Sequence, residues 1–339
     1  MTEGDRAIGA APAANGLSDF PFLDAYLAPI SGVLVQPDVT DIYINHPGEI
    51  WIERLGGGIE REEVPALTEA GLWRLARQIA SLSHQGINRE HPLLSARLPD
   101  GSRVQIVAPP ATRGPLAMAI RRHVSASLTL EDYARSGAFD EPVPESAELP
   151  AVGRDDRVSL LADAVRQRKT ILISGGTSTG KTTFLNALIR EIPREERLIL
   201  IEDTPELQID HPNAVGLVAV KGGLGEAKVN ADDLLQASLR MRPDRIILGE
   251  LRGNEAYTFL RAINTGHPGS MTTIHADSPT KAIEQLALII LQSGTSLTRD
   301  DIVYYIHNTV DLFIQLERYK GRRKVRMIAD KHSLESGAV

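Results

Sequence analysis

The chain has 339 residues, of which 42% are hydrophobic and 24% are charged. This length favours two domains of ordinary size, and the apolar fraction excludes a chain that is disordered throughout. The net charge of -7 argues against a protein that coats nucleic acid, and the absence of cysteine excludes disulfides, thiolate zinc sites and a cysteine nucleophile. No apolar run approaches the length of a membrane span and no signal-peptide core opens the chain, so we expect a cytoplasmic protein.

The first half of the chain combines short strands with one clear helix. Alternating residues predict strands at Asp41–Asn45 and Glu49–Glu53, joined as a hairpin. Thr68 would cap a helix whose apolar residues recur at helical spacing, namely Leu72, Leu75, Ala76, Ile79 and Leu82. Further strands are predicted at Ser95–Leu98, Arg103–Val107 and Leu116–His123. This pattern is typical of an α+β module built from antiparallel hairpins.

The second half alternates strands and helices. The predicted strands are Thr170–Ser174, Leu198–Glu202, Ala214–Val220, Arg245–Leu251 and Met271–His275, and the predicted helices are Lys181–Arg190, Ala231–Met241 and Asn254–Thr265. Short, continuous apolar runs suit strands that are buried on both faces, as in a parallel sheet covered by helices. A final hairpin is predicted from Val310–Gln315 and Lys324–Ile328. The fold class is therefore α/β for this half.

A boundary between the halves is indicated by residues 139–153, which contain three prolines among small and acidic residues. We predict an N-terminal domain over residues 1–138, with residues 1–16 flexible. A linker over 139–153, an α/β domain over 154–332 and a tail over 333–339 would follow.

A phosphate-binding motif follows the first strand of the second half. The run Gly175-Gly176-Thr177-Ser178-Thr179-Gly180-Lys181-Thr182 fits GxxxxGK[ST] and opens a predicted helix. Its backbone N–H groups would face the phosphates of a nucleotide, with Thr183 extending the cradle. Lys181 would reach the β- and γ-phosphates, and the Thr182 hydroxyl would bind Mg²⁺. The motif therefore predicts nucleotide binding.

Acidic residues end two of the predicted strands. Glu250 follows an apolar strand and would lie near the Mg²⁺ shell, either directly or through water. Glu202, Asp203 and Glu206 follow another strand, where three carboxylates beside phosphates would repel one another unless one of them polarises water. A solvated acidic loop is the alternative. His275, at a third strand end, would sense the γ-phosphate or contact a neighbouring subunit, or would be structural only.

Four motifs in series carry a family resemblance. GGTSTGKTT, IEDTPEL (201–207), RIILGELRG (245–253) and TGHPGSMTTIHAD (265–277) resemble the Walker A, Asp, Walker B and His boxes of the secretion ATPase superfamily. That superfamily includes PilT-like pilus motors, GspE-like type II motors and VirB/TrbB-type traffic ATPases. LPDGSRV (98–104), the strand around Arg121 and SLTLEDY (127–133) resemble the type IV secretion and conjugation branch. The absence of cysteine counts against the GspE-like branch, whose members usually carry a tetracysteine zinc element.

The resemblance implies a RecA-like P-loop NTPase domain preceded by a smaller, PAS-like α+β domain. It implies a homo-hexamer that hydrolyses ATP with Mg²⁺ to power substrate transfer or pilus assembly. The hexamer would lie at the cytoplasmic face of the inner membrane, with membrane components of the machine as partners. Glu206 matches the family's proposed general base. Arg103 and Arg121 (or Arg122) match arginines that reach the phosphates, and Arg240 matches a further arginine of the RecA-like domain.

Alternatives remain at this point. A pilus retraction or assembly motor would use the same chemistry on another cargo. A RecA-like nucleic-acid motor is disfavoured by the net charge and by an aromatic content of 4%, so direct DNA binding is not expected. A nucleotide-dependent scaffold would not need Glu206 and Glu250. The basic stretch Arg318–Arg326 would either contact an anionic membrane surface or form a solvated hairpin tip.

Overall fold

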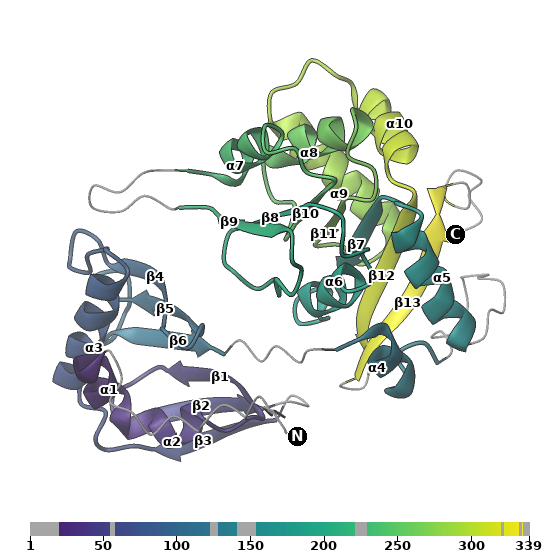
Figure 1. The fold of residues 1–339 in the computed structure, drawn as a ribbon. Helices are drawn as coiled ribbons and strands as arrows, with labels where there is room; N and C mark the ends of the chain where they lie inside the picture. The colour runs from purple at the N-terminus through teal and green to yellow at the C-terminus, as the bar shows by residue number, and fades with distance from the viewer. Residues whose placement is uncertain are drawn as a thin grey trace, which may run out of the picture. The chain divides into compact units, whose positions relative to one another are not determined.

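The computed structural model describes residues 20–54, 58–122, 128–140, 154–220, 229–319, 322–331 and 334. Contacts divide the chain between residues 123 and 124 into two units, which we treat separately (Figure 1). The segment predicted to be flexible (1–16), residues 141–153 of the expected linker and most of the tail lie outside the described residues. Within the described parts of the chain, no helix has both the length and the apolar composition needed to cross a bilayer.

The first unit is built on a six-stranded antiparallel sheet in the order β3-β2-β1-β6-β5-β4. The strands are β1 (Val39–Ile44), β2 (Glu49–Arg54), β3 (Ile59–Glu63), β4 (Leu93–Arg97), β5 (Arg103–Val107) and β6 (Ala117–Arg121). The helices are α1 (Pro21–Leu27), the 3-10 helix η1 (Ala28–Ile30), α2 (Ser31–Leu34) and α3 (Glu69–Leu82). Apolar side chains from the sheet and from α3 form one core, as an α+β module requires.

The helix cap and the turn glycine that the sequence predicts in this unit are both present. The Thr68 hydroxyl accepts a hydrogen bond from the Gly71 N–H at 3.1 Å, which caps α3. The β4–β5 turn places Gly101 at φ +90°, a conformation that glycine adopts without strain. The register of the sheet sets Arg103 opposite Arg121 on neighbouring strands.

The second unit contains a seven-stranded sheet in the order β13-β12-β7-β11-β10-β8-β9. The strands are β7 (Ile171–Gly175), β8 (Leu198–Glu202), β9 (Ala214–Val218), β10 (Arg245–Leu248), β11 (Met271–Ile274), β12 (Leu312–Tyr319) and β13 (Arg322–Asp330). All neighbouring strands are parallel except β12 and β13, which form the predicted final hairpin. Every residue of the four central strands is buried, in agreement with their continuous apolar runs.

Helices cover both faces of this sheet (Figure 1). They are α4 (Leu130–Arg135), α5 (Arg154–Arg166), α6 (Lys181–Ile189), α7 (Ala231–Ser238), α8 (Glu255–Asn264), α9 (Pro279–Gln292) and α10 (Arg299–Thr309). Ile171 and Ile173 pack in one apolar cluster with α4, α5 and α6, whereas Leu172 packs in a second cluster with α7 to α10. The alternation of strand side chains thus produces a three-layer α/β unit.

Residues 128–140 belong to the second unit, although the proline-based boundary places residues up to 138 in the first. Tyr133 and Phe139 are buried in the core of the second unit. The Val325 N–H donates to the Ala138 carbonyl at 2.9 Å, and Arg157 donates to the Phe139 carbonyl at 3.0 Å. The difference arises because the prolines begin only at residue 142, whereas the apolar residues of α4 already need a core to bury them.

Candidate active site

The phosphate-binding loop lies between the end of β7 and the start of α6. Ser178 and Gly180 adopt left-handed conformations, with φ of +62° and +89°. A Cβ atom added at Gly175 would lie 2.5 Å from the Thr179 hydroxyl and 3.0 Å from the Leu316 carbonyl oxygen, so only glycine fits there. The loop therefore has the strand–loop–helix context that the motif requires, and the backbone N–H groups of α6 begin at its end.

Lys181 is held inside this loop. Its side chain is buried, and its ammonium donates hydrogen bonds to the carbonyls of Gly175 at 2.9 Å and Gly176 at 3.3 Å. The same nitrogen lies 3.3 Å from Nδ1 and 3.4 Å from Nε2 of His275, which follows β11. The structure thus brings together two predicted site residues that are 94 positions apart in the chain.

Glu250, which follows β10, completes this group. Its Oε1 lies 2.8 Å from His275 Nε2, and its Oε2 accepts a hydrogen bond from Arg252 Nε at 2.7 Å. Oε1 is nevertheless a buried acceptor without an aligned hydrogen bond to any described residue. Burial and the charge of Lys181 lower the pKa of His275, whereas the charge of Glu250 opposes them. The imidazole is therefore neutral over a wider pH range than an ordinary histidine.

The three acids of the Asp box occupy different environments. Glu202 is buried, and its Oε1 accepts hydrogen bonds from the backbone N–H groups of Glu206 and Leu207, both at 2.7 Å. Asp203 is exposed and lies 3.6 Å from Arg252 Nη1. Glu202 therefore shapes the turn. Glu206 has a half-buried side chain, and its role as the general base stays a prediction.

Asn186 connects the Asp box to the helix that begins at the phosphate loop. Its amide donates to the Glu206 carbonyl at 3.2 Å and accepts from the Gln208 N–H at 2.9 Å. Sequence reasoning overlooked this residue, because an asparagine inside a helix carries no motif. It also overlooked Arg252, which follows Glu250 by two positions within the Walker B box and was visible there as a strand-end cation.

The predicted arginines lie in three places. Arg103 and Arg121 are cross-strand neighbours in the first unit, where Arg121 Nε lies 3.8 Å from Asp41 Oδ1. Arg122, the alternative to Arg121, donates to the backbone carbonyls of Gln36 and Val39 and thus has a structural role. Arg240 is an exposed residue that follows α7 in the second unit. Their approach to phosphates stays a prediction.

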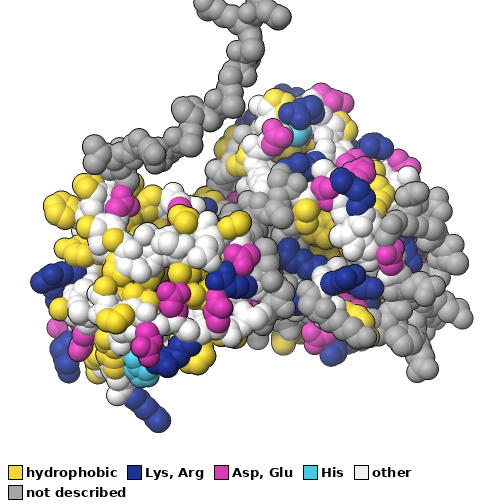
Figure 2. Space-filling model, turned by 90° about the horizontal axis from the view of Figure 1, so that it is seen from below, with side chains coloured by type: hydrophobic (Ala, Val, Ile, Leu, Met, Phe, Trp, Pro, Cys, Tyr) yellow, Lys and Arg dark blue, Asp and Glu magenta, His cyan; other side chains and the backbone are white. Residues whose placement is uncertain are grey.

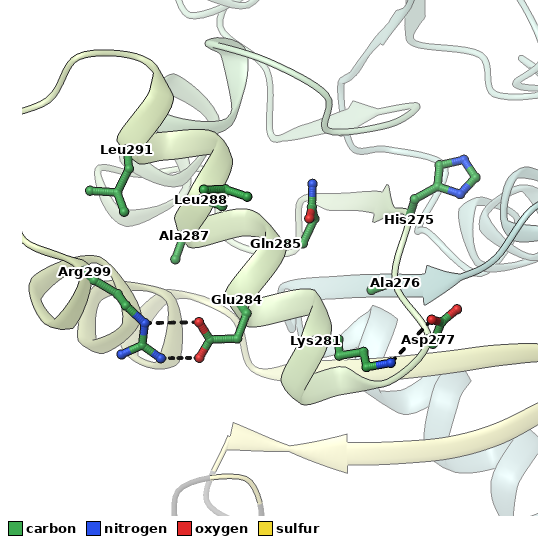
Figure 3. A pocket seen from close by; sticks show the side chains of 10 residues that line it. All are labelled: His275, Ala276, Asp277, Lys281, Glu284, Gln285, Ala287, Leu288, Leu291 and Arg299. Atoms are coloured by element: carbon green, nitrogen blue, oxygen red, sulfur yellow. Dashed lines mark hydrogen bonds and ion pairs between the residues drawn. The ribbon is translucent and has the colours of Figure 1, made fainter.

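A cavity of about 480 Å³ opens beside His275 (Figure 3). One wall is the segment His275–Asp277, and the other is formed by α9, including Lys281 and Leu288. Figure 3 shows an ion pair across the rim, between Lys281 and Asp277 at 3.5 Å. A second cavity of about 460 Å³, whose lining includes Asp203, Glu250 and Arg252, lies on another side of the Walker B acid. The strand-end residues are thus accessible from solvent.

This arrangement defines a class of protein. A phosphate loop after the interior strand β7 and an acid after β10 lie on a mostly parallel sheet covered on both faces. These are the parts of a RecA-like P-loop ATPase, here preceded by a smaller α+β unit. Residues 25–318 match the family described as type II/IV secretion system protein, and the chain belongs to that family. The resemblance read from the four boxes is confirmed, and the chain is an ATPase of this superfamily.

Similar proteins agree with this assignment. The type IV secretion system protein VirB11 of Bartonella henselae is 41% identical over 324 residues, which cover 89% of this chain and 91% of that protein. The X-ray structure of the Legionella pneumophila ATPase DotB is 20% identical, with a TM-score of 0.59, and covers 93% of this chain and 86% of its own. The crystal structure of the pilus retraction motor PilT with bound ADP gives 20% identity, a TM-score of 0.55 and the same coverage, and both structures support the fold.

Proposed function

We propose that this chain is the motor ATPase of a type IV secretion system, in which ATP hydrolysis powers substrate transfer or pilus assembly. The observation that carries the proposal is the contact of Lys181, His275 and Glu250 at one edge of the sheet. The proposal is supported because a phosphate-binding cation, a neutral imidazole and a carboxylate lie together beside the phosphate loop, where a bound terminal phosphate would contact them. Identity of 41% to a type IV secretion protein supports the branch.

The residues divide the chemistry between them. The loop over residues 175–183 binds the phosphates through its N–H groups, and Lys181 moves from the loop carbonyls to the β- and γ-phosphates. Glu206 accepts a proton from the attacking water. His275 contacts the γ-phosphate and reports its loss to Glu250 and thereby to β10.

The donors at this edge also fit a magnesium ion. Thr182 lies in the first turn of α6, and the buried Oε1 of Glu250 is an acceptor that a metal-bound water would satisfy. Mg²⁺, when bound, neutralises phosphate charge during the transfer of the terminal phosphoryl group. Carboxylate, hydroxyl and water oxygens are the ligands that this ion prefers.

Arginine side chains balance the remaining negative charge of the phosphates. We assign Arg103 and Arg121 of the first unit, and Arg240 of the second unit, to the phosphates. The assembly is a homo-hexamer located in the cytoplasm at the inner membrane, where it contacts membrane components of the secretion machine. Figure 2 shows acidic and basic side chains interspersed among the described residues of the face in view. The net charge of -7 argues against a nucleic-acid motor.

The test is steady-state ATPase activity of the full chain together with its light-scattering mass, with and without ATP and Mg²⁺. We expect a particle near six subunits whose turnover falls at least about 100-fold in Lys181→Ala and in Glu250→Gln. Single-stranded DNA should not stimulate turnover. Full activity of Lys181→Ala would refute the site. Activity that rises many-fold with DNA would instead favour a nucleic-acid motor.

A second arm addresses the branch. A strain that lacks the chain should lose secretion or conjugal transfer, and wild type but not Glu250→Gln should restore it. Restoration of pilus retraction without any effect on transfer would favour the pilus motor.

A further inference from the structure

Arg323, on the final hairpin, lies against the phosphate-binding loop. A Cβ atom built on Gly180 would lie 2.9 Å from Arg323 Cδ and 3.2 Å from its Nε. Gly180 is the residue immediately before α6, so the guanidinium is next to the N–H groups that face the phosphates. Within the basic stretch Arg318–Arg326, Arg323 is therefore not simply solvated but lies beside the phosphate loop.

Arg323 is a half-buried cation whose side chain has no anionic partner among the described residues. Its neighbour Lys324 donates to the Asp140 carbonyl at 3.3 Å, and Arg326 lies 3.6 Å from a carboxylate oxygen of Glu317. The side chain of Arg323 forms no hydrogen bond or ion pair with another residue within the described ranges. Since removing a charge from water without compensation is costly, this position favours an anionic ligand.

A second group beside it lacks a partner. Tyr133 on α4 is 4% exposed, and its hydroxyl is buried without a hydrogen bond to a described residue. Its ring packs edge-to-face on Phe184 of α6, with centroids 5.0 Å apart. Burial raises the pKa of Tyr133 and the charge of Arg323 opposes this, so the two groups are within electrostatic reach. A buried hydroxyl and a half-buried guanidinium, neither with a side-chain hydrogen bond to a described residue, thus lie near the first turn of α6.

The order of the strands indicates which phosphates of a bound nucleotide would be nearest to Arg323. His275 and Glu250 follow β11 and β10, which lie on one side of β7, whereas β12 and β13 lie on the other side. The residues expected at the γ-phosphate therefore come from one flank of the loop and Arg323 from the opposite flank. A cation on that flank meets the α- and β-phosphates, which ATP and ADP share.

We propose that Arg323 is a nucleotide-binding residue, whose guanidinium binds the α- or β-phosphate from the β13 side of the loop. It strengthens the binding of ATP and ADP to the same extent. It does not stabilise the charge that develops at the γ-phosphate during hydrolysis, so its contribution appears in affinity rather than in turnover.

The experiment compares Arg323→Ala with Arg322→Ala in the full chain. Arg322 is the adjacent, exposed residue of β13, and its loss removes the same charge. Isothermal titration with ADP should show about a tenfold higher Kd for Arg323→Ala, and steady-state kinetics about a tenfold higher KM for ATP with kcat within about twofold. Arg322→Ala should match wild type in all three quantities.

Two outcomes would overturn the proposal: an unchanged Kd for ADP in Arg323→Ala, or an equal rise in Kd in both variants. A fall in kcat at unchanged Kd would place Arg323 in the hydrolysis step instead, which also contradicts it. If Arg323→Ala does not fold, Arg323→Gln preserves the length of the side chain and carries the same expectation. Because ADP binding is measured without turnover or secretion, failure here is distinct from failure of the proposed motor role.

Discussion

His275 Nε2 lies 2.8 Å from Glu250 Oε1, so the residues that follow β11 and β10 touch at the edge of the sheet. Lys181 lies within 3.4 Å of both nitrogens of the same imidazole. One neutral side chain therefore stands between the cation of the phosphate loop and the Walker B carboxylate. A ligand that draws Lys181 toward itself changes the environment of all three groups.

The lowered pKa of His275 predicts a pH dependence of stability. A histidine that binds its proton less tightly in the folded chain than in the unfolded chain causes stability to fall as the pH drops below 6.5. Lys181 and Arg252 oppose protonation there, and Glu250 favours it. Melting temperatures from about pH 7.5 to about pH 5.5 should decline less steeply in His275→Gln than in wild type. The exposed His46→Gln is the control, and parallel curves for all three proteins would contradict the prediction.

Glu206→Gln should separate catalysis from folding. If Glu206 is the general base, kcat should fall about 100-fold or more, because an amide cannot accept the proton. The melting temperature and the Kd for ADP should stay near wild type. The nearby exposed Glu195→Gln should retain full turnover. An active Glu206→Gln would reassign the base within the Asp box.

Glu202→Ala should lower the stability of the fold, whereas Glu206→Gln should lower turnover. Its loss leaves the N–H groups of Glu206 and Leu207 without their acceptor, which should cost about 2 kcal/mol of stability. Urea denaturation with the exposed Asp203→Ala as comparison measures this cost. Equal stability of the two variants would mean that Glu202 does not hold the turn.

The pair Glu196–Arg245 predicts acid sensitivity. Arg245 is fully buried, and its hydrogen bonds to Glu196 at 2.7 and 2.8 Å lower the pKa of that carboxyl from 4.5 to about 2. Stability from this pair is present above pH 4.5 and is lost as the pH falls toward 2. Glu196→Gln should lower stability at neutral pH by about 3 kcal/mol, because a buried guanidinium loses its anion.

Stability curves of Glu196→Gln and wild type should converge as acid protonates the carboxyl. A constant difference between them down to about pH 2 would show that the pair does not titrate as expected.

Much of the second unit follows from local sequence. Continuous apolar runs predict buried parallel strands, and the motifs predict Lys181 and Glu250 beside the phosphates. For His275 the sequence left three alternatives open, of which a place at the γ-phosphate was one. The final hairpin and the cap at Thr68 were also visible. The sequence analysis did not predict the helices α5, α9 and α10. In α9 the continuous apolar run Leu286–Leu291 hides the helical spacing that would reveal its buried face.

Other features depend on contacts that no local pattern records. Three acids of the Asp box are alike in sequence, but Glu202 is the buried one, and its Oε1 accepts from two backbone N–H groups. The sequence places Tyr133 in the first domain, whereas in the structure its ring packs on Phe184 of the second unit. Arg323 is one of several basic residues in a row, and only the pairing of β13 with β12 selects the one that faces the loop.

The attachment of residues 138–140 to β13 has a mechanical consequence. Val325 and Lys324 hold the carbonyls of Ala138 and Asp140, and these donors directly follow Arg323 in the strand. Residues 138–140 of the second unit are therefore attached to the same strand that borders the phosphate loop. If phosphate draws Arg323 inward, the two donors that follow it move with the strand, and the hydrogen-bonded residues 138–140 move with them.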